Sequence, residues 1–173
     1  MTDAQPTETS HITTTAPGFS TAEWPARDRA DLDLWTDLVR TTAAVRGRLA
    51  DRLDAEVGML PEEVDLLMRL EAVPEQRLRM ADVSRALQVS RSGVTRLVDR
   101  LVARGLVERA ACPSDRRVVY AGLTDDGRRA LEEAVPLLRA GLREHFGRHL
   151  RPRESDGLSA ALRKILDAES AGL

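Results

Sequence analysis

Residues 89–101 read VSRSGVTRLVDRL, and their pattern predicts the central helix of the fold. Its apolar residues recur at offsets of three, four and seven, which places them on one face of a helix. They are Val94, Leu97, Val98 and Leu101. Ser90 is suited to cap the start of this helix, and Gly105 supplies the left-handed residue that commonly follows a helix end. The sequence therefore predicts a helix that begins after Ser90 and stops at Gly105.

A shorter helix is predicted before this one, and a β-hairpin after it. Val83 and Leu87 are apolar positions of the short helix, which a tight turn joins to the longer one. Residues 106–111 and 118–121 are predicted to be strands on either side of a Pro-Ser-Asp turn at 113–115. Two short helices followed by a hairpin make a winged helix-turn-helix.

Further helical patterns precede this core. Apolar residues recur at helical spacing from residue 34 to Gly58, where the pattern stops. A second helix is predicted to start at Pro61 and to end before Pro74, and a short extended piece surrounds Leu78.

Two more helices are predicted after the hairpin. Thr124, followed by two acidic residues, caps a long helix that ends at Arg151 and Pro152. Ser155 is predicted to cap a last helix.

Together these elements predict a mainly α-helical chain with a small β-wing. Residues 1–20 are rich in Thr, Pro and Ser and are expected to form a disordered tail before one domain at 21–173. The winged helix-turn-helix occupies 61–123. The helices at 34–58 and 124–173 carry more apolar surface than this core can cover, so we expect them to be the dimerisation helices of a homodimer.

Composition excludes several classes of protein. The chain has 173 residues, one Cys and no apolar stretch of membrane-spanning length, which predicts a soluble cytosolic protein without a disulfide, a membrane partner or a secretory signal. Cys112 is open to two interpretations, a redox sensor or a passive thiol. The common nucleotide-binding and hydrolase motifs are absent, so we expect neither an enzyme nor a cofactor.

Charge is divided unevenly along the chain. The whole chain carries −2, but residues 85–117 contain eight Arg and three acidic residues and are therefore +5, leaving −7 on the remainder. This division predicts a polyanion-binding face on an acidic body, with double-stranded DNA as the expected partner.

The start of the helix after Ser90 has the side chains for reading DNA. Its outward polar residues are Arg91, Ser92, Thr95 and Arg96. A helix of this kind fits the major groove, where its N-terminal side chains meet base edges. Gly93 would let the backbone approach DNA closely, whereas Arg100 and Arg104 are farther along and suit phosphates.

The hairpin tip supplies a second predicted DNA contact. Arg117, with Arg116 beside it, is expected to enter the narrow minor groove, where the potential is most negative. Asp115 is a poor phosphate neighbour and is expected to orient an Arg.

Four segments resemble, in order and spacing, the MarR family of bacterial transcriptional regulators. They are VSRSGVTRLVDRL at 89–101, RGLVER at 104–109, DRR at 115–117 and LTDDG at 123–127. The resemblance covers about residues 30–167 and implies a homodimer built by the first and last helices. It also implies a repressor whose DNA affinity falls when a small ligand binds, with Asp115 and Arg117 matching the wing motif. A twofold dimer would bind a pseudo-palindromic operator.

The sequence departs from the family pattern at two places. The helix before the turn begins at Arg79 and Met80, where the family often has Thr-Pro, and the turn holds Gln88, where many helix-turn-helix proteins have Gly. Neither position is expected to touch DNA.

A further resemblance concerns a possible ligand site. The family's urate- and purine-binding subgroup links a Trp, an Asp and two Arg, and the corresponding residues here are Trp24, Trp35, Asp65, Arg96 and Arg109. Ala30 stands where that subgroup usually has Pro. The alternative is structural: Trp35 packs in the dimer core, and Asp65 pairs with an Arg.

Two other functions remain open from the sequence. His145 and His149 stand four apart on an expected helix face, the spacing of a zinc-responsive regulator, although the H-E-x-x-H pattern of a zinc hydrolase is absent. The second alternative is a winged-helix protein-interaction module that does not bind DNA.

Overall fold

The computed structural model describes residues 21–22, 24–111, 115 and 118–171. The predicted tail at 1–20, Cys112, Arg116 and Arg117 lie outside the described residues. By its contacts the chain divides into two compact units, residues 1–41 and 42–173.

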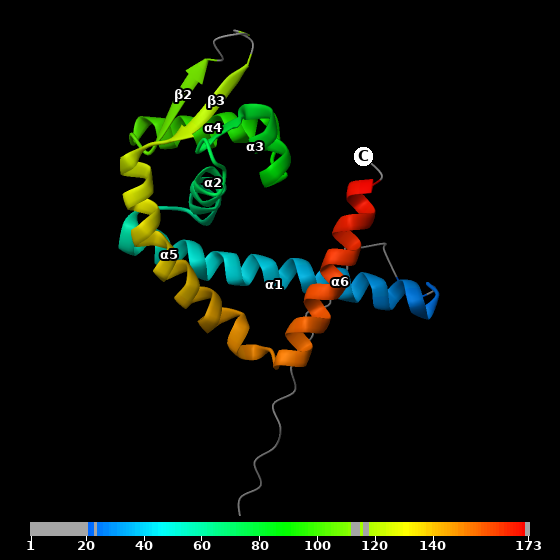
Figure 1. The fold of residues 1–173 in the computed structure, drawn as a ribbon. Helices are drawn as coiled ribbons and strands as arrows, with labels where there is room; N and C mark the ends of the chain where they lie inside the picture. The colour runs from blue at the N-terminus through cyan, green and yellow to red at the C-terminus, as the bar shows by residue number, and fades with distance from the viewer. Residues whose placement is uncertain (1–20, 23, 112–114, 116–117, 172–173) are drawn as a thin grey trace, which may run out of the picture. The chain divides into compact units, whose positions relative to one another are not determined.

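The described residues form helices and a small sheet, as expected for a mainly α-helical chain with a β-wing (Figure 1). In chain order they are α1 (Ala26–Val57), α2 (Pro61–Glu71), β1 (Arg77–Arg79), α3 (Met80–Leu87), α4 (Arg91–Ala103), β2 (Val107–Ala111), β3 (Val119–Leu123), α5 (Asp125–His145), the 3-10 helix η1 (Gly147–His149) and α6 (Pro152–Ala171).

The sheet has three antiparallel strands in the order β1-β3-β2. The predicted hairpin is β2 and β3, with Val107 opposite Leu123 and Ala111 opposite Val119. The extended piece expected around Leu78 is β1, and it pairs with the other edge of β3. The pairing of this extended piece with β3 was not predicted, since three residues carry too little alternation to show their partner.

α4 begins and ends where the sequence predicted, because the signals for both ends lie within or beside the helix. The Ser90 hydroxyl accepts a hydrogen bond from the Gly93 N–H at 3.2 Å, which caps the helix. The helix buries the predicted apolar face, namely Val94, Leu97, Val98 and Leu101. Gly105 follows the helix end with φ +72°. The turn before α4 places Gln88 at φ +52°, a left-handed conformation in which a side chain is strained.

One hydrophobic core joins α2, α3, α4 and α5 to the inner face of the sheet. It includes fully buried residues from each of these elements, such as Leu67, Val83, Leu101 and Ala134, together with Ala121 of β3. The core therefore holds α4 by one face and leaves its opposite face at the surface.

Three helix boundaries differ from the predicted ones. α1 begins at Ala26 rather than at residue 34, because its first turns are polar and are supported by side-chain pairs such as Arg27 with Asp31. α5 ends at His145, before the predicted stop at Arg151 and Pro152.

The last helix, α6, starts at Pro152, so the prediction that Ser155 caps it was wrong. Pro suits the first turn of a helix, and the Glu154 carboxylate accepts a hydrogen bond from the Arg151 N–H at 2.8 Å.

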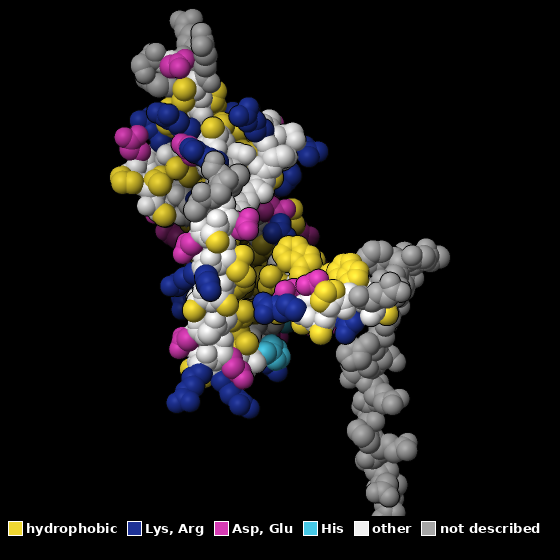
Figure 2. Space-filling model, turned by 90° about the vertical axis from the view of Figure 1, so that its right-hand side faces the viewer, with side chains coloured by type: hydrophobic (Ala, Val, Ile, Leu, Met, Phe, Trp, Pro, Cys, Tyr) yellow, Lys and Arg dark blue, Asp and Glu magenta, His cyan; other side chains and the backbone are white. Residues whose placement is uncertain are grey.

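Large apolar side chains remain exposed in both units. Within residues 1–41, Leu34 and Trp35 of α1 are 70% and 63% exposed. Within residues 42–173, Leu142, Phe146, Ile165 and Leu166 are exposed. Figure 2 shows hydrophobic side chains open to solvent on the face it presents. Among the described residues, no helix is long and apolar enough to cross a membrane.

Candidate nucleic-acid interface

The N-terminal half of α4 presents its predicted side chains at the surface. Arg91, Ser92, Thr95 and Arg96 are all exposed. Within the part of the chain that the structure describes, neither Arg91 nor Arg96 has an ion-pair partner. The Thr95 hydroxyl donates to the Arg91 carbonyl at 2.9 Å, so its oxygen lone pairs face outward as acceptors. This end of α4 also carries the positive pole of the helix dipole, which favours anions.

Gly93 has a structural reason to be glycine. A Cβ at this position would lie 2.5 Å from the Val89 Cγ1, so a side chain here would displace Val89 from the turn. The close approach to DNA predicted from the sequence stays a prediction.

The C-terminal half of α4 differs from the N-terminal half. Arg100 and Arg104 both pair with Glu63 of α2, at 3.2 and 3.3 Å. The Glu63 side chain is only 4% exposed, and no other charged or polar residue in the described core is as deeply buried. Glu63 was not predicted from the sequence. The available signal was a glutamate three residues after the helix N-cap, where it commonly accepts a hydrogen bond from the N-cap backbone.

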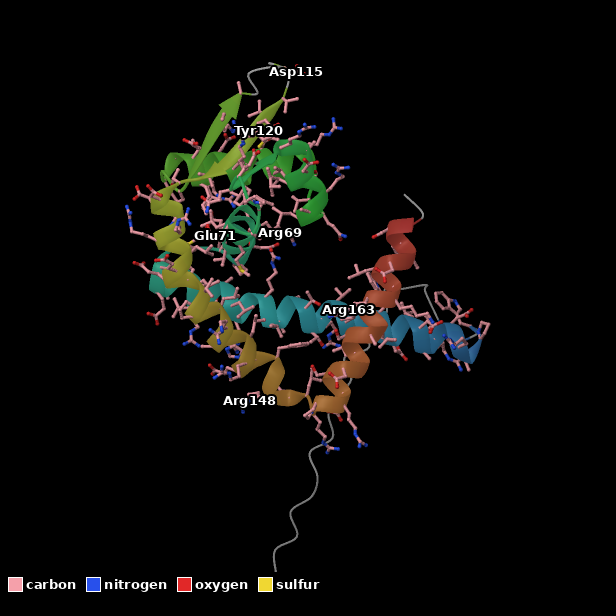
Figure 3. The ribbon with its side chains drawn as sticks, viewed as in Figure 1. Arg69, Glu71, Asp115, Tyr120, Arg148 and Arg163 are labelled. Atoms are coloured by element: carbon pink, nitrogen blue, oxygen red, sulfur yellow. The ribbon has the colours of Figure 1, made fainter. Side chains whose placement is uncertain are left out.

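The wing is tied to α4 by Arg109 of β2. Its Nη2 pairs with the Asp99 carboxylate at 2.9 Å and donates to the Thr95 carbonyl at 3.5 Å. Asp115 is exposed at the hairpin tip (Figure 3). Arg116 and Arg117, the predicted minor-groove residues, lie outside the described residues.

A hollow of about 590 Å³ opens beside the N-terminal half of α4. Residues of β1, α3, α4, β2 and β3 line it, including Arg79, Arg91 and Arg109, with Val94 and Val119 on its apolar part. An apolar floor beside guanidinium groups suits a small organic anion.

The residues of the suggested urate-like site have separate surroundings. Asp65 pairs with Arg69 on the next turn of α2 at 3.1 Å, which is the structural pairing considered as the alternative. Arg109 pairs with Asp99, and Arg96 is exposed. Trp24 and Trp35 belong to the first unit, and both are exposed there.

The predicted helix face shared by His145 and His149 was wrong. His145 is the last residue of α5, and His149 lies in η1, with Phe146 between them at φ −133° outside the helical region. Among the described residues, no three His, Cys, Asp or Glu side chains group as metal ligands would.

The comparison with known proteins agrees with this geometry. The sequence profile of the MarR family matches residues 57–118. The uncharacterized HTH-type transcriptional regulator YkoM of Bacillus subtilis is 36% identical over 109 residues, which span 63% of this chain and 69% of YkoM. The chain belongs to the MarR family. The predicted membership is therefore confirmed, and it agrees with the expectation that the chain is not an enzyme.

Two further relatives are similar to this MarR-family chain. The transcriptional repressor MprA of Escherichia coli is 33% identical over 100 residues, which span 58% of this chain and 56% of MprA. The chain thus spans little more than half the length of that relative. The structure of Sco3205, a MarR-family transcriptional regulator from Streptomyces coelicolor in complex with DNA, has a TM-score of 0.75 and 27% identity, covering 83% of this chain and 92% of Sco3205.

Proposed function

We propose that this MarR-family chain is a transcriptional regulator that binds double-stranded DNA as a homodimer and represses transcription until a small ligand lowers its affinity for DNA. The observation that carries the proposal is the N-terminal half of α4. Its exposed arginines have no ion-pair partner among the described residues, and they lie at the positive end of the helix dipole. The similarity to Sco3205, whose structure contains DNA, supports the same conclusion.

In the proposed complex, the N-terminal half of α4 lies in the major groove. Arg91, Ser92, Thr95 and Arg96 contact base edges, because side chains at the start of a recognition helix reach deepest into the groove. Gly93 leaves room there for the phosphate backbone. At the hairpin tip, Arg117 and Arg116 enter the adjacent minor groove, with Asp115 orienting one of them.

The homodimer is supported by the apolar surface that one chain leaves exposed. Trp35 and Leu34 in the first unit, and Ile165 and Leu166 in the second, need a partner surface to leave water. A twofold homodimer presents two copies of α4, so its operator would be a pseudo-palindrome.

The hollow beside α4 is the proposed effector site. A small organic anion held by Arg91 and Arg109 would occupy the Arg91 guanidinium, which the proposed DNA complex also uses. Binding of the anion would therefore lower the affinity for DNA, and DNA would lower the affinity for the anion. MprA is named a transcriptional repressor, which supports repression as the direction of regulation.

The test is duplex binding as a function of salt. The purified protein is titrated by fluorescence anisotropy into DNA from its own upstream intergenic region and into random duplex. We expect tighter binding to the upstream DNA and a steep loss of affinity with salt. No binding to any duplex at low salt would overturn the proposal and favour the protein-interaction module.

A further inference from the structure

We propose that Glu63 is a positioning residue that withholds Arg100 and Arg104 from DNA phosphates and so confines DNA contact by α4 to its N-terminal half. This inference rests on the proposed function, since it concerns how the recognition helix divides its arginines.

Three hydrogen bonds hold the Glu63 carboxylate. Oε2 accepts from the Leu60 backbone N–H at 3.0 Å and from Arg104 Nη1 at 3.3 Å, and Oε1 accepts from Arg100 Nε at 3.2 Å. The carboxylate is buried, whereas the Arg100 and Arg104 side chains are 48% and 37% exposed. The two guanidinium groups therefore sit between a buried anion and the surface.

This arrangement makes the two arginines poor phosphate ligands although they are half exposed. An arginine that moved outward to a phosphate would break its ion pair with Glu63. Glu63 cannot follow, because its hydrogen bond with the Leu60 N–H fixes it in the core. Leaving a buried carboxylate with fewer donors costs free energy. Arg100 and Arg104 also lie at the C-terminal end of α4, where the helix dipole disfavours a second anion.

The consequence is a higher ratio of specific to non-specific binding. Phosphate contacts add affinity for every DNA sequence, whereas base contacts add it for one. By neutralising guanidinium charge at the far end of α4, Glu63 lowers affinity for random DNA and leaves Arg91 and Arg96 to read bases.

The test compares two Glu→Gln substitutions at neighbouring positions of α2, each made in the full-length protein. Glu63→Gln keeps the shape and an oxygen that accepts from the Leu60 N–H, but removes the charge that holds Arg100 and Arg104. Glu62→Gln is the matched control, because it removes the same charge from the neighbouring position, where the partner is Arg46 of α1 at 2.8 Å.

The readout is the salt dependence of binding to a fluorescein-labelled duplex of random sequence. Glu63→Gln should steepen the slope of log Kobs against log[salt] by about one per protomer, as expected for one additional phosphate contact. It should also tighten binding to random duplex at low salt, while Glu62→Gln leaves the slope as in the wild type. Equal slopes for the two variants, with wild-type binding intact, would overturn the role of Glu63 alone. Failure of the wild type to bind any duplex would overturn the proposed function as well.

A second pair of variants keeps the test decisive if Glu63→Gln does not fold. Arg104→Gln should leave the slope of the otherwise unchanged protein nearly as it is, because Glu63 holds the Arg104 guanidinium away from phosphates. Arg91→Gln should make the slope less steep. An equal reduction by both variants would show that Arg104 contacts phosphate in the wild type and would refute the proposal.

Discussion

The two halves of α4 carry arginines in opposite surroundings. At the N-terminal half, Arg91 and Arg96 are exposed, and among the described residues no carboxylate pairs with them. At the C-terminal half, Arg100 and Arg104 share the buried carboxylate of Glu63. The number of arginines in a segment is therefore not enough to locate a DNA-binding surface. Pairing and position along the helix dipole decide which charges are available.

The first prediction tests whether the C-terminal half of α4 stabilises the folded protein. Leu101 is completely buried, and Val102 beside it is exposed. We expect Leu101→Ala to lower the free energy of unfolding by about 2–5 kcal/mol, because it leaves a cavity in the core. Val102→Ala should change it by less than about 0.5 kcal/mol. Urea denaturation at fixed protein concentration measures both, and equal effects would contradict the burial.

The second prediction tests whether the N-terminal half carries specificity. Arg91→Ala should lower the preference for operator over random duplex by about tenfold or more, the loss expected for one base contact of about 1–3 kcal/mol. Arg104→Ala should lower that preference less. Competition binding with both duplexes gives the two ratios, and the reverse order would mean that α4 docks by its other end.

The third prediction concerns the cap that starts the DNA-binding half. Ser90→Ala removes the acceptor for the Gly93 N–H and should cost about 1 kcal/mol of stability. Ser92→Ala, two residues on, is the control and should have a smaller effect, because its hydroxyl bonds to that of Ser90 and caps no backbone N–H among the described residues. Thermal denaturation measures the stability of both variants. An equal fall in melting temperature for the two would show that the cap does not contribute.

The smallest predicted effect lies in the turn before α4. Gln88 has φ +52°, so Gln88→Gly should relieve strain and stabilise the protein by up to about 1 kcal/mol. Gln88→Ala keeps a Cβ at the same backbone conformation and should bring no gain. A lower melting temperature for the Gly variant than for the Ala variant would refute the strain argument.

Much of α4 was predictable because its signals are local. The apolar face, the Ser90 cap and the left-handed Gly105 lie within one short segment, and each acts on the backbone beside it. Gln88 is a related case, since its departure from the usual glycine marked the position where the structure has positive φ. The start of α1 was missed because its first turns are polar and lack the apolar periodicity that the prediction used.

The amino-acid sequence was enough to predict the winged helix-turn-helix, the family and the polar face of α4, because helix periodicity, caps and turns depend on neighbouring residues. Which arginines on that helix share a buried carboxylate depends on how the chain packs. Glu63 lies 37 residues from Arg100 and 41 from Arg104, and nothing in the spacing links them. Their pairing arises because the core packs α2 against α4 and brings a buried carboxylate to two half-exposed guanidinium groups.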